Sequence, residues 1–167
     1  MPRKIKPRNI KQFCIQAAGV LFFAFIDYLL KYYAQRGLPG AGRITLIPGI
    51  LALRYTQNTG AAFGSLSGMT SILSVFTALI LLCLMLFLLF EESGNKTYHI
   101  FLPLIIAGGL GNLIDRVFRG YVVDYLEFLF IKFAIFNFAD CLVTVGCSAI
   151  MAHLIYTIIR EQKHGTA

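Results

Sequence analysis

Asp124 and Asp140 are the two acidic residues of this chain whose surroundings best suit acid–base chemistry. Asp140 lies inside an apolar stretch with no basic residue within one helical turn, and an unpaired carboxylate there indicates a function. Asp124 stands three residues before Glu127, so its local pattern fits a helix N-cap as well as it fits catalysis. Two carboxylates that approach each other can share one proton, so that one activates water while the other acts as an acid. If Asp124 and Asp140 meet, they could act as the dyad of an aspartic protease does.

Covalent and metal-dependent chemistry find less support in the sequence. His99, His153 and His164 are expected away from the aspartates, mid-helix, at the opposite membrane face or in the tail, so no serine or cysteine triad is predicted. The four cysteines lie in apolar stretches without zinc-site spacing, which indicates packing or lipid-facing positions: Cys14, Cys83, Cys141 and Cys147. We expect no metal and no cofactor.

The elements that must position the aspartates have the composition of membrane-spanning segments. Hydrophobic residues make up 57% of the 167 residues, and the mean hydropathy is +0.73, far above that of a soluble domain. Four apolar windows, each near the ~20 residues that cross hydrocarbon, predict transmembrane helices: residues 12–33, 69–90, 98–117 and 136–159. We therefore predict an all-α polytopic membrane protein that forms a single membrane domain over residues 1–167.

Basic residues near the predicted spans indicate how the chain crosses the membrane. Four spans put both termini on one side, and cytoplasmic flanks are rich in Lys and Arg. Such residues precede the first window and follow the last: Arg3, Lys4, Lys6, Arg8 and Lys11, then Arg160 and Lys163. We expect both termini in the cytoplasm and a retained first helix, since that window contains Asp27 and Lys31 and no evident small-x-small cleavage site follows. The net charge of +7 is then a topogenic signal, and no nucleic acid is expected as a partner.

Two longer segments would face outward: residues 34–68 and 118–135. In the first, residues 43–47 and 50–55 are β-favouring runs around Pro48-Gly49, a dipeptide suited to a turn. They predict a small extracytoplasmic β-structure at the membrane surface. In the second, residues 123–133 mix charged and apolar side chains, which predicts an interfacial helix lying on the bilayer.

Polar residues from every predicted element converge at the outer ends of the spans: Asp27, Lys31, Asn58, Asn112, Asp115, Arg116, Asp124, Asn137 and Asp140. Ionisable groups are costly in lipid and mark functional sites. Structural roles are still favoured for Asp27 and Lys31, which are spaced as an i, i+4 ion pair, and for Asp115 beside Arg116. Arg116 stays open to contact with a substrate, and Asn58 with the two residues after it also fits a simple turn.

Five short motifs occur in order along the chain: Asp27-x-x-x-Lys31, Asn58-Thr59-Gly60-Ala61-Ala62-Phe63, Gly111-Asn112-x-x-Asp115-Arg116, Gly120-x-Val122-x-Asp124-Tyr125 and Phe136-Asn137-x-Ala139-Asp140. Together they resemble the lipoprotein signal peptidase family, also called signal peptidase II. One such motif alone is weak, but five in order over four correctly placed spans are specific. The resemblance covers nearly the whole chain.

The resemblance implies a role for each motif residue. It implies that Asp124 and Asp140 are the catalytic dyad. It also implies a substrate-binding set, Asn58, Asn112, Arg116 and Asn137, and a structural set, Asp27, Lys31, Asp115, Gly60 and Gly111. The implied protein is a monomer of the bacterial cytoplasmic (inner) membrane with its site near the extracytoplasmic face. Its implied partners are membrane lipid and a diacylglyceryl-prolipoprotein, cut just before the lipidated cysteine.

Two other functions fit the polar residues less well. A transporter or proton pathway also uses intramembrane carboxylates, but here they cluster at one face and the second window carries no ionisable residue to continue a path. A metal-dependent lipid phosphatase would use the aspartates to hold Mg²⁺. Insensitivity to chelators would argue against that enzyme.

Overall fold

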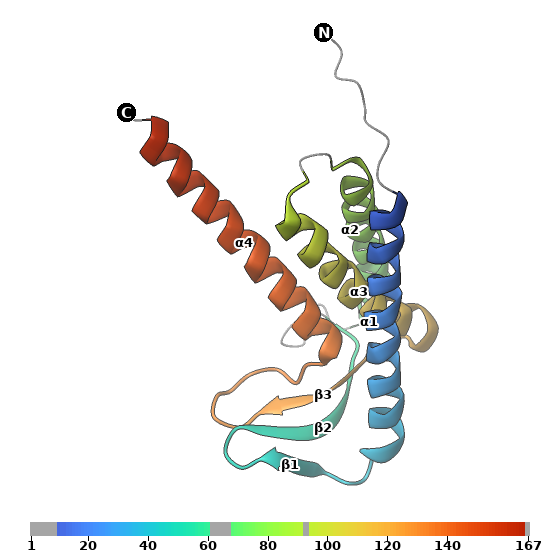
Figure 1. Cartoon of the computed structure of the whole chain (residues 1–167). Helices are drawn as coiled ribbons and strands as arrows, with labels where there is room; N and C mark the ends of the chain where they lie inside the picture. Colours follow the sequence, from blue (N-terminus) through green and yellow to red (C-terminus); the bar gives the residue numbers. More distant parts are fainter. Residues whose placement is uncertain (1–9, 61–67, 92–93, 166–167) are drawn as a thin grey trace.

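The structure is a computed structural model that describes residues 10–60, 68–91 and 94–165, in seven elements. Along the chain these are α1 (Ile10–Gly37), β1 (Arg43–Ile47), β2 (Leu51–Asn58), α2 (Thr70–Phe90), α3 (Lys96–Arg119), β3 (Val122–Phe128) and α4 (Phe138–Gly165). The strands form a sheet at one end of the helical bundle (Figure 1). The first turn of α1 and the last turns of α4 lie at the other end.

The four predicted spans are confirmed, because each helix is long and apolar enough to cross a membrane. Their bounds differ from the prediction by a few residues at each end, where apolar periodicity says little about helix termini. α3 is the central helix: its most apolar window is 44% buried, against 11% for α2 and α4. α1, α2 and α4 all pack against α3 and turn large apolar side chains outward, as helices surrounded by lipid do.

Glycines allow the central helix to contact its neighbours closely. A Cβ placed on Gly108 of α3 would collide with the carbonyl oxygen of Ala139 in α4. A Cβ on Gly146 of α4 would meet Ile105 Cγ1 at 2.5 Å and the Phe101 carbonyl oxygen at 2.9 Å. Small residues therefore set the approach of α3 and α4, as in many membrane helix pairs.

Pro103 interrupts the hydrogen bonding of α3, and a residue of α1 compensates for it. Proline has no N–H, so the carbonyl of His99, four residues earlier, lacks its usual helical donor. The Gln16 Nε2 donates to this oxygen at 3.2 Å and lies 2.9 Å from His99 Nδ1. His99 Nε2 in turn lies 3.2 Å from a carboxylate oxygen of Glu91. This polar contact joins α1 to α3 at the end of the bundle away from the sheet.

The predicted β-hairpin is confirmed. β1 and β2 pair antiparallel, with Arg43 opposite Arg54. The Pro48-Gly49 turn joins them: Gly49 has φ +72°, and the Ile50 N–H donates to the Ile47 carbonyl at 3.0 Å. A proline followed by a residue at positive φ is the pattern of a type II turn.

The interfacial helix predicted over residues 123–133 is wrong, because β3 occupies Val122–Phe128 as the third strand of the sheet. β3 pairs antiparallel with β2, and Val123 and Tyr125 are buried in a cluster that includes residues of α1. The three-residue spacing of Asp124 and Glu127 suggested a helix, but each carboxylate has a tertiary partner instead. Adjacent β-branched valines and available pairing on β2 favour the strand. The N-cap role considered for Asp124 is therefore excluded.

Some residues used in the sequence analysis lie outside the described part of the chain. They are the basic residues before residue 10 and Ala61, Ala62 and Phe63 of the second motif.

Candidate active site

Asp124 lies in the middle of β3, opposite Thr56 of β2, and its side chain is held by two amides. Its Oδ2 accepts a hydrogen bond from Asn58 Nδ2 at 2.9 Å, and its Oδ1 accepts one from Asn137 Nδ2 at 2.6 Å. Asp124 is 1% exposed. Asn58 ends β2 and Asn137 precedes α4, so three elements meet at this carboxylate.

Asp140 lies in the first turn of α4, where it forms a reciprocal cap with Asn137. Asn137 Oδ1 accepts from the Asp140 backbone N–H at 3.0 Å, and Asp140 Oδ2 accepts from the Asn137 backbone N–H at 3.1 Å. This is the geometry of a capping box, with an asparagine at the N-cap and an aspartate three residues later. The sequence analysis considered such a box at Asp124 and Glu127, but the structure places it here.

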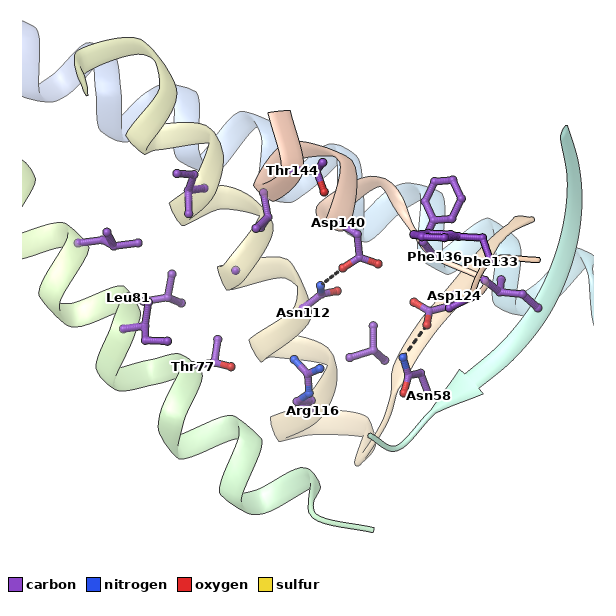
Figure 2. A pocket seen from close by; sticks show the side chains of 18 residues that line it. Asn58, Thr77, Leu81, Asn112, Arg116, Asp124, Phe133, Phe136, Asp140 and Thr144 are labelled. Carbon is purple, nitrogen blue, oxygen red and sulfur yellow. Dashed lines mark hydrogen bonds between the residues drawn. The ribbon is translucent and has the colours of Figure 1, made fainter. Parts of the chain in front are cut away.

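A third asparagine completes the contacts of the two carboxylates. Asn112 of α3 donates through Nδ2 to Asp140 Oδ1 at 2.8 Å. The Asn112 Oδ1 accepts from Asn137 Nδ2 at 3.2 Å. Asn137 therefore connects Asp124, Asp140 and Asn112, and the two aspartates share one hydrogen-bonded network. Figure 2 shows two of its bonds, from Asn112 to Asp140 and from Asn58 to Asp124.

Lys31 is the buried cation behind this network. Its ammonium lies 2.8 Å from Asp27 Oδ2, 3.2 Å from Asp115 Oδ2 and 2.8 Å from Asn112 Oδ1. The predicted ion pair of Asp27 and Lys31 is present, and both side chains are 1% exposed. A Cβ on Gly111 would collide with the Asp27 carboxylate. The glycine in this motif therefore allows the ion pair of Asp27 and Lys31 to pack against α3.

The two acidic partners of Lys31 each support an element of the site. Asp27 Oδ1 accepts from the Ala139 backbone N–H at 3.0 Å and so holds the first turn of α4. Asp115 Oδ2 accepts from the Val123 backbone N–H at 3.1 Å and so holds β3. Asp115 also pairs with Arg119, one helical turn later, rather than with its neighbour Arg116.

Arg116 faces the cavity, close enough to Asp124 and Asp140 for their charges to act on it. Its guanidinium Nη2 lies 3.4 Å from the Gly60 carbonyl oxygen, a weak hydrogen bond. Its Nε is buried and has no hydrogen-bond partner among the described residues. Arg116 therefore offers donors that a polar group entering the cavity could accept.

A cavity of about 420 Å³ opens beside the two aspartates. Its polar end is formed by Asn58, Asn112, Arg116, Asp124 and Asp140, as Figure 2 shows. The rest of its wall is largely apolar and comes from α2, α3, α4, β3 and the segment after β3: Thr77, Ile80, Leu81, Leu84, Ile105, Gly109, Val122, Phe133, Ala134, Ile135, Phe136, Val143 and Thr144. The cavity thus joins a pair of carboxylates to a surface suited to acyl chains or an apolar helix.

Burial controls the acidity of Asp124, which lies outside the membrane-spanning helices. Burial, followed by the negative charge of Asp140, raises the pKa of Asp124 to about 6. The hydrogen bonds from Asn58 and Asn137 and the charge of Lys31 act in the opposite direction. A carboxyl with such a pKa can hold or release a proton near neutral pH, as an acid–base catalyst must.

Every predicted site residue is in the described part of the chain, and the structure gathers them around Asp124 and Asp140. Gly60 contributes its backbone N–H to Asn58 Oδ1 at 3.0 Å. The sequence analysis missed the apolar wall, including Thr77 of α2 and Thr144 of α4. A single threonine in an apolar helix carries no signal of a cavity, so only the packing could reveal these positions.

Comparison with known proteins agrees with the geometry. A model of the family described as "Signal peptidase (SPase) II" matches residues 19–156. The chain belongs to the signal peptidase II family. Members of this family are aspartyl proteases that remove signal peptides from prolipoproteins during lipoprotein maturation. The sequence-based resemblance to signal peptidase II is confirmed, and the chain is a multi-pass bacterial membrane enzyme.

Individual signal peptidase II relatives match over most of their length. The lipoprotein signal peptidase of Streptococcus pneumoniae is 36% identical over 156 residues, covering 93% of this chain and 99% of the relative. That of Streptococcus agalactiae is 42% identical over 145 residues, covering 87% and 94%. Two solved bacterial membrane enzymes superpose with TM-scores of 0.78 and 0.76, at 31% and 32% identity. They cover 85% and 84% of this chain, and 88% and 92% of their own chains.

Proposed function

We propose that Asp124 and Asp140 are the catalytic dyad of this signal peptidase II, and that it cuts diacylglyceryl-modified prolipoproteins just before the lipidated cysteine. The observation that carries the proposal is the placement of both carboxylates in one asparagine-bridged network at the polar end of a mainly apolar cavity. Such a cavity would keep acyl chains out of water while the scissile peptide bond lies beside the aspartates.

The dyad would work by sharing one proton. The ionised carboxylate activates a water molecule for attack on the peptide carbonyl, and the protonated one polarises that carbonyl. The proton taken from water is then delivered to the leaving nitrogen. Like-charge repulsion between the two groups favours the singly protonated state, and the titration belongs to the pair.

The residues around the dyad would position the peptide. Arg116 has a buried Nε without a partner among the described residues, and it points toward the cavity. It would donate to a carbonyl oxygen of the substrate. Asn58, Asn112 and Asn137 line or border the same space and hold the carboxylates in place for the attacking water.

We further propose the orientation of the enzyme in the membrane. Arg160 and Lys163 follow the last span, and basic residues precede the first, so both termini would be cytoplasmic. The sheet and the dyad lie at the opposite end of the bundle, which would be the extracytoplasmic face (Figure 1). We also propose that the enzyme acts as a monomer.

Substitution of each aspartate by asparagine tests the dyad. Asparagine is nearly isosteric with aspartate and keeps hydrogen-bonding capacity, but it cannot exchange a proton. We expect Asp124→Asn and Asp140→Asn each to abolish cleavage, with a loss of about 10³-fold or more, while the proteins purify as the wild type does. The measurement is the cleavage of a diacylglyceryl-modified prolipoprotein by purified enzyme, with the new N-terminus identified. Substantial cleavage by either variant would overturn the assignment.

A further inference from the structure

Lys31 does more in this structure than neutralise its acidic neighbours, because it contacts a side chain that binds the dyad. The ammonium lies 2.8 Å from Asn112 Oδ1, and the other end of the same amide donates to Asp140 Oδ1 at 2.8 Å. One asparagine therefore separates the Lys31 charge from the carboxylate of Asp140.

The polarity of Lys31 determines which way the Asn112 amide points. An ammonium group can only donate, so the atom of Asn112 that faces it must be the oxygen. The Asn112 amide nitrogen must then face Asp140, where it donates to the carboxylate. The other two amides of the site are oriented in the same way, by obligate backbone donors: Gly60 N–H for Asn58 and Asp140 N–H for Asn137.

Without Lys31, little would hold Asn112 in this orientation. Its oxygen would keep only the Asn137 Nδ2, which lies 3.2 Å away and is shared with Asp124 at 2.6 Å. The amide could then rotate and present its oxygen to Asp140. In that orientation the amide oxygen repels an ionised carboxylate and accepts a hydrogen bond from a protonated one. The proton shared by the two aspartates would then no longer be placed as the reaction needs.

We propose that Lys31 is a positioning residue of the dyad: it holds the Asn112 amide with its N–H toward Asp140 and its oxygen toward Asn137. This inference rests on the proposed function of the dyad and extends it to α1, which contributes no residue to the cavity wall. Lys31 pairs directly with Asp27 and Asp115, and its charge also acts on Asp124.

A charge-balanced variant distinguishes the positioning role of Lys31 from a purely structural role. In Lys31→Met with Asp27→Asn, one positive and one negative charge are removed together. Asp115 keeps Arg119 as a partner, and an asparagine at position 27 keeps an oxygen for the Ala139 N–H. No carboxylate of the cluster is left without a partner, so the double variant should fold.

We expect the double variant to unfold near the wild-type temperature and to show kcat lowered about tenfold or more, with KM within about twofold of wild type. If Lys31 only neutralises Asp27, the kcat of the double variant should lie within about twofold of wild type, and that result would overturn the proposal. A double variant that fails to fold would also count against it, since the loss would then be structural.

A double-mutant cycle on kcat tests whether Lys31 acts through Asn112. Lys31→Met should lower kcat little further once Asn112 is alanine, so that the variant with both changes is about as slow as Asn112→Ala alone and the two losses do not add. Additive losses would contradict the proposal. Gln16→Leu is the matched control, because it breaks the polar contact between α1 and α3 at the far end of the bundle. It should lower the unfolding temperature with kcat unchanged.

Failure of this inference is distinguishable from failure of the proposed function. If Asp124→Asn or Asp140→Asn still cleaves, the dyad assignment is wrong. If both are inactive while the charge-balanced variant keeps wild-type kcat, only the role of Lys31 is wrong.

Discussion

Each carboxylate oxygen of Asp124 and Asp140 accepts a hydrogen bond, and each of the four donors belongs to an asparagine. Neutral amides stabilise an ionised carboxylate without placing a full positive charge beside it. Burial and the second carboxylate oppose them and prevail, and the pKa of Asp124 is raised to about 6. Because asparagines rather than lysines or arginines donate these four hydrogen bonds, a proton remains available near neutral pH.

The pH dependence of cleavage should report this balance. A dyad that needs one proton loses activity when that proton leaves, so kcat/KM should fall above about pH 6, by about tenfold per pH unit. Asn58 donates to Asp124 Oδ2 and favours the charged form. Its removal in Asn58→Ala should raise the pKa of Asp124 and move this decline to higher pH. The measurement is kcat/KM from pH 4 to 9, a range that brackets the pKa of Asp124.

Gln57→Ala provides a control for Asn58→Ala, since Gln57 also lies in β2 but bonds only to the exposed Tyr55 hydroxyl in its described contacts. Its pH profile should match the wild type. If the fall in kcat/KM of Asn58→Ala stays at the same pH or moves to lower pH, the ionisation of Asp124 does not determine that fall.

At the scale of elements, α1 supports the site although it contributes neither of the two aspartates. It brings no side chain to the cavity, yet its Asp27 holds the first turn of α4 at Ala139. The contact depends on Gly111 of α3, where the Asp27 carboxylate occupies the space that a Cβ would fill. The site is thus assembled by the approach of α1 to α3.

Gly111→Ala should therefore damage both folding and activity. The added methyl must displace the Asp27 carboxylate, and overpacking of this kind costs about 1–3 kcal/mol. We expect a lower unfolding temperature in detergent and a lower kcat, because the start of α4 carries Asp140.

The control for this substitution is Gly19→Ala in α1, where a Cβ meets no atom within 4 Å of the described residues. It should leave stability and cleavage unchanged or slightly improve stability, since alanine favours the helix. Equal behaviour of the two variants would mean that close approach at Gly111 is not what holds the site.

For the whole molecule, the main feature is a polar site between a sheet and a bundle surrounded by lipid. The helices present large apolar side chains outward, while the asparagines and aspartates gather where the sheet meets α3 and α4. A cavity at this boundary can receive apolar chains from one direction and a peptide from the other. The arrangement favours a substrate that is part lipid and part peptide.

Cleavage should therefore require prior lipidation of the substrate. The acyl chains would anchor the peptide in the mainly apolar cavity and hold the scissile bond beside the dyad, so binding energy remote from the bond would contribute to rate. We expect the same prolipoprotein without diacylglycerol to be cut about 100-fold more slowly or not at all. The comparison uses the two substrate forms in equal amounts of detergent. Equal turnover of the two forms would contradict the proposal that the enzyme requires a lipid-modified substrate.

The sequence alone determined the four membrane-spanning helices, the first hairpin and the chemical groups of this protein. Long uncharged stretches such as Met69–Phe90 can only satisfy their backbone in lipid as helices, so the four spans were predictable. Pro48-Gly49 similarly determined the hairpin turn. Ionisable residues are so costly in membranes that Asp140 stood out as functional without any structure.

Tertiary structure decided how these groups meet. Residues 123–133 could be read as an interfacial helix because they mix charged and apolar side chains, but pairing with β2 makes the first part a strand. The partner of Asp115 is Arg119 rather than Arg116, and Lys31 reaches Asn112 as well as Asp27. The contact of Lys31 with Asn112 joins residues 81 positions apart, and that of Asp27 with Ala139 joins residues 112 positions apart. Local periodicity carries no information at that distance, because the approach of two helices depends on packing at positions such as Gly111 that act only once the chain is folded.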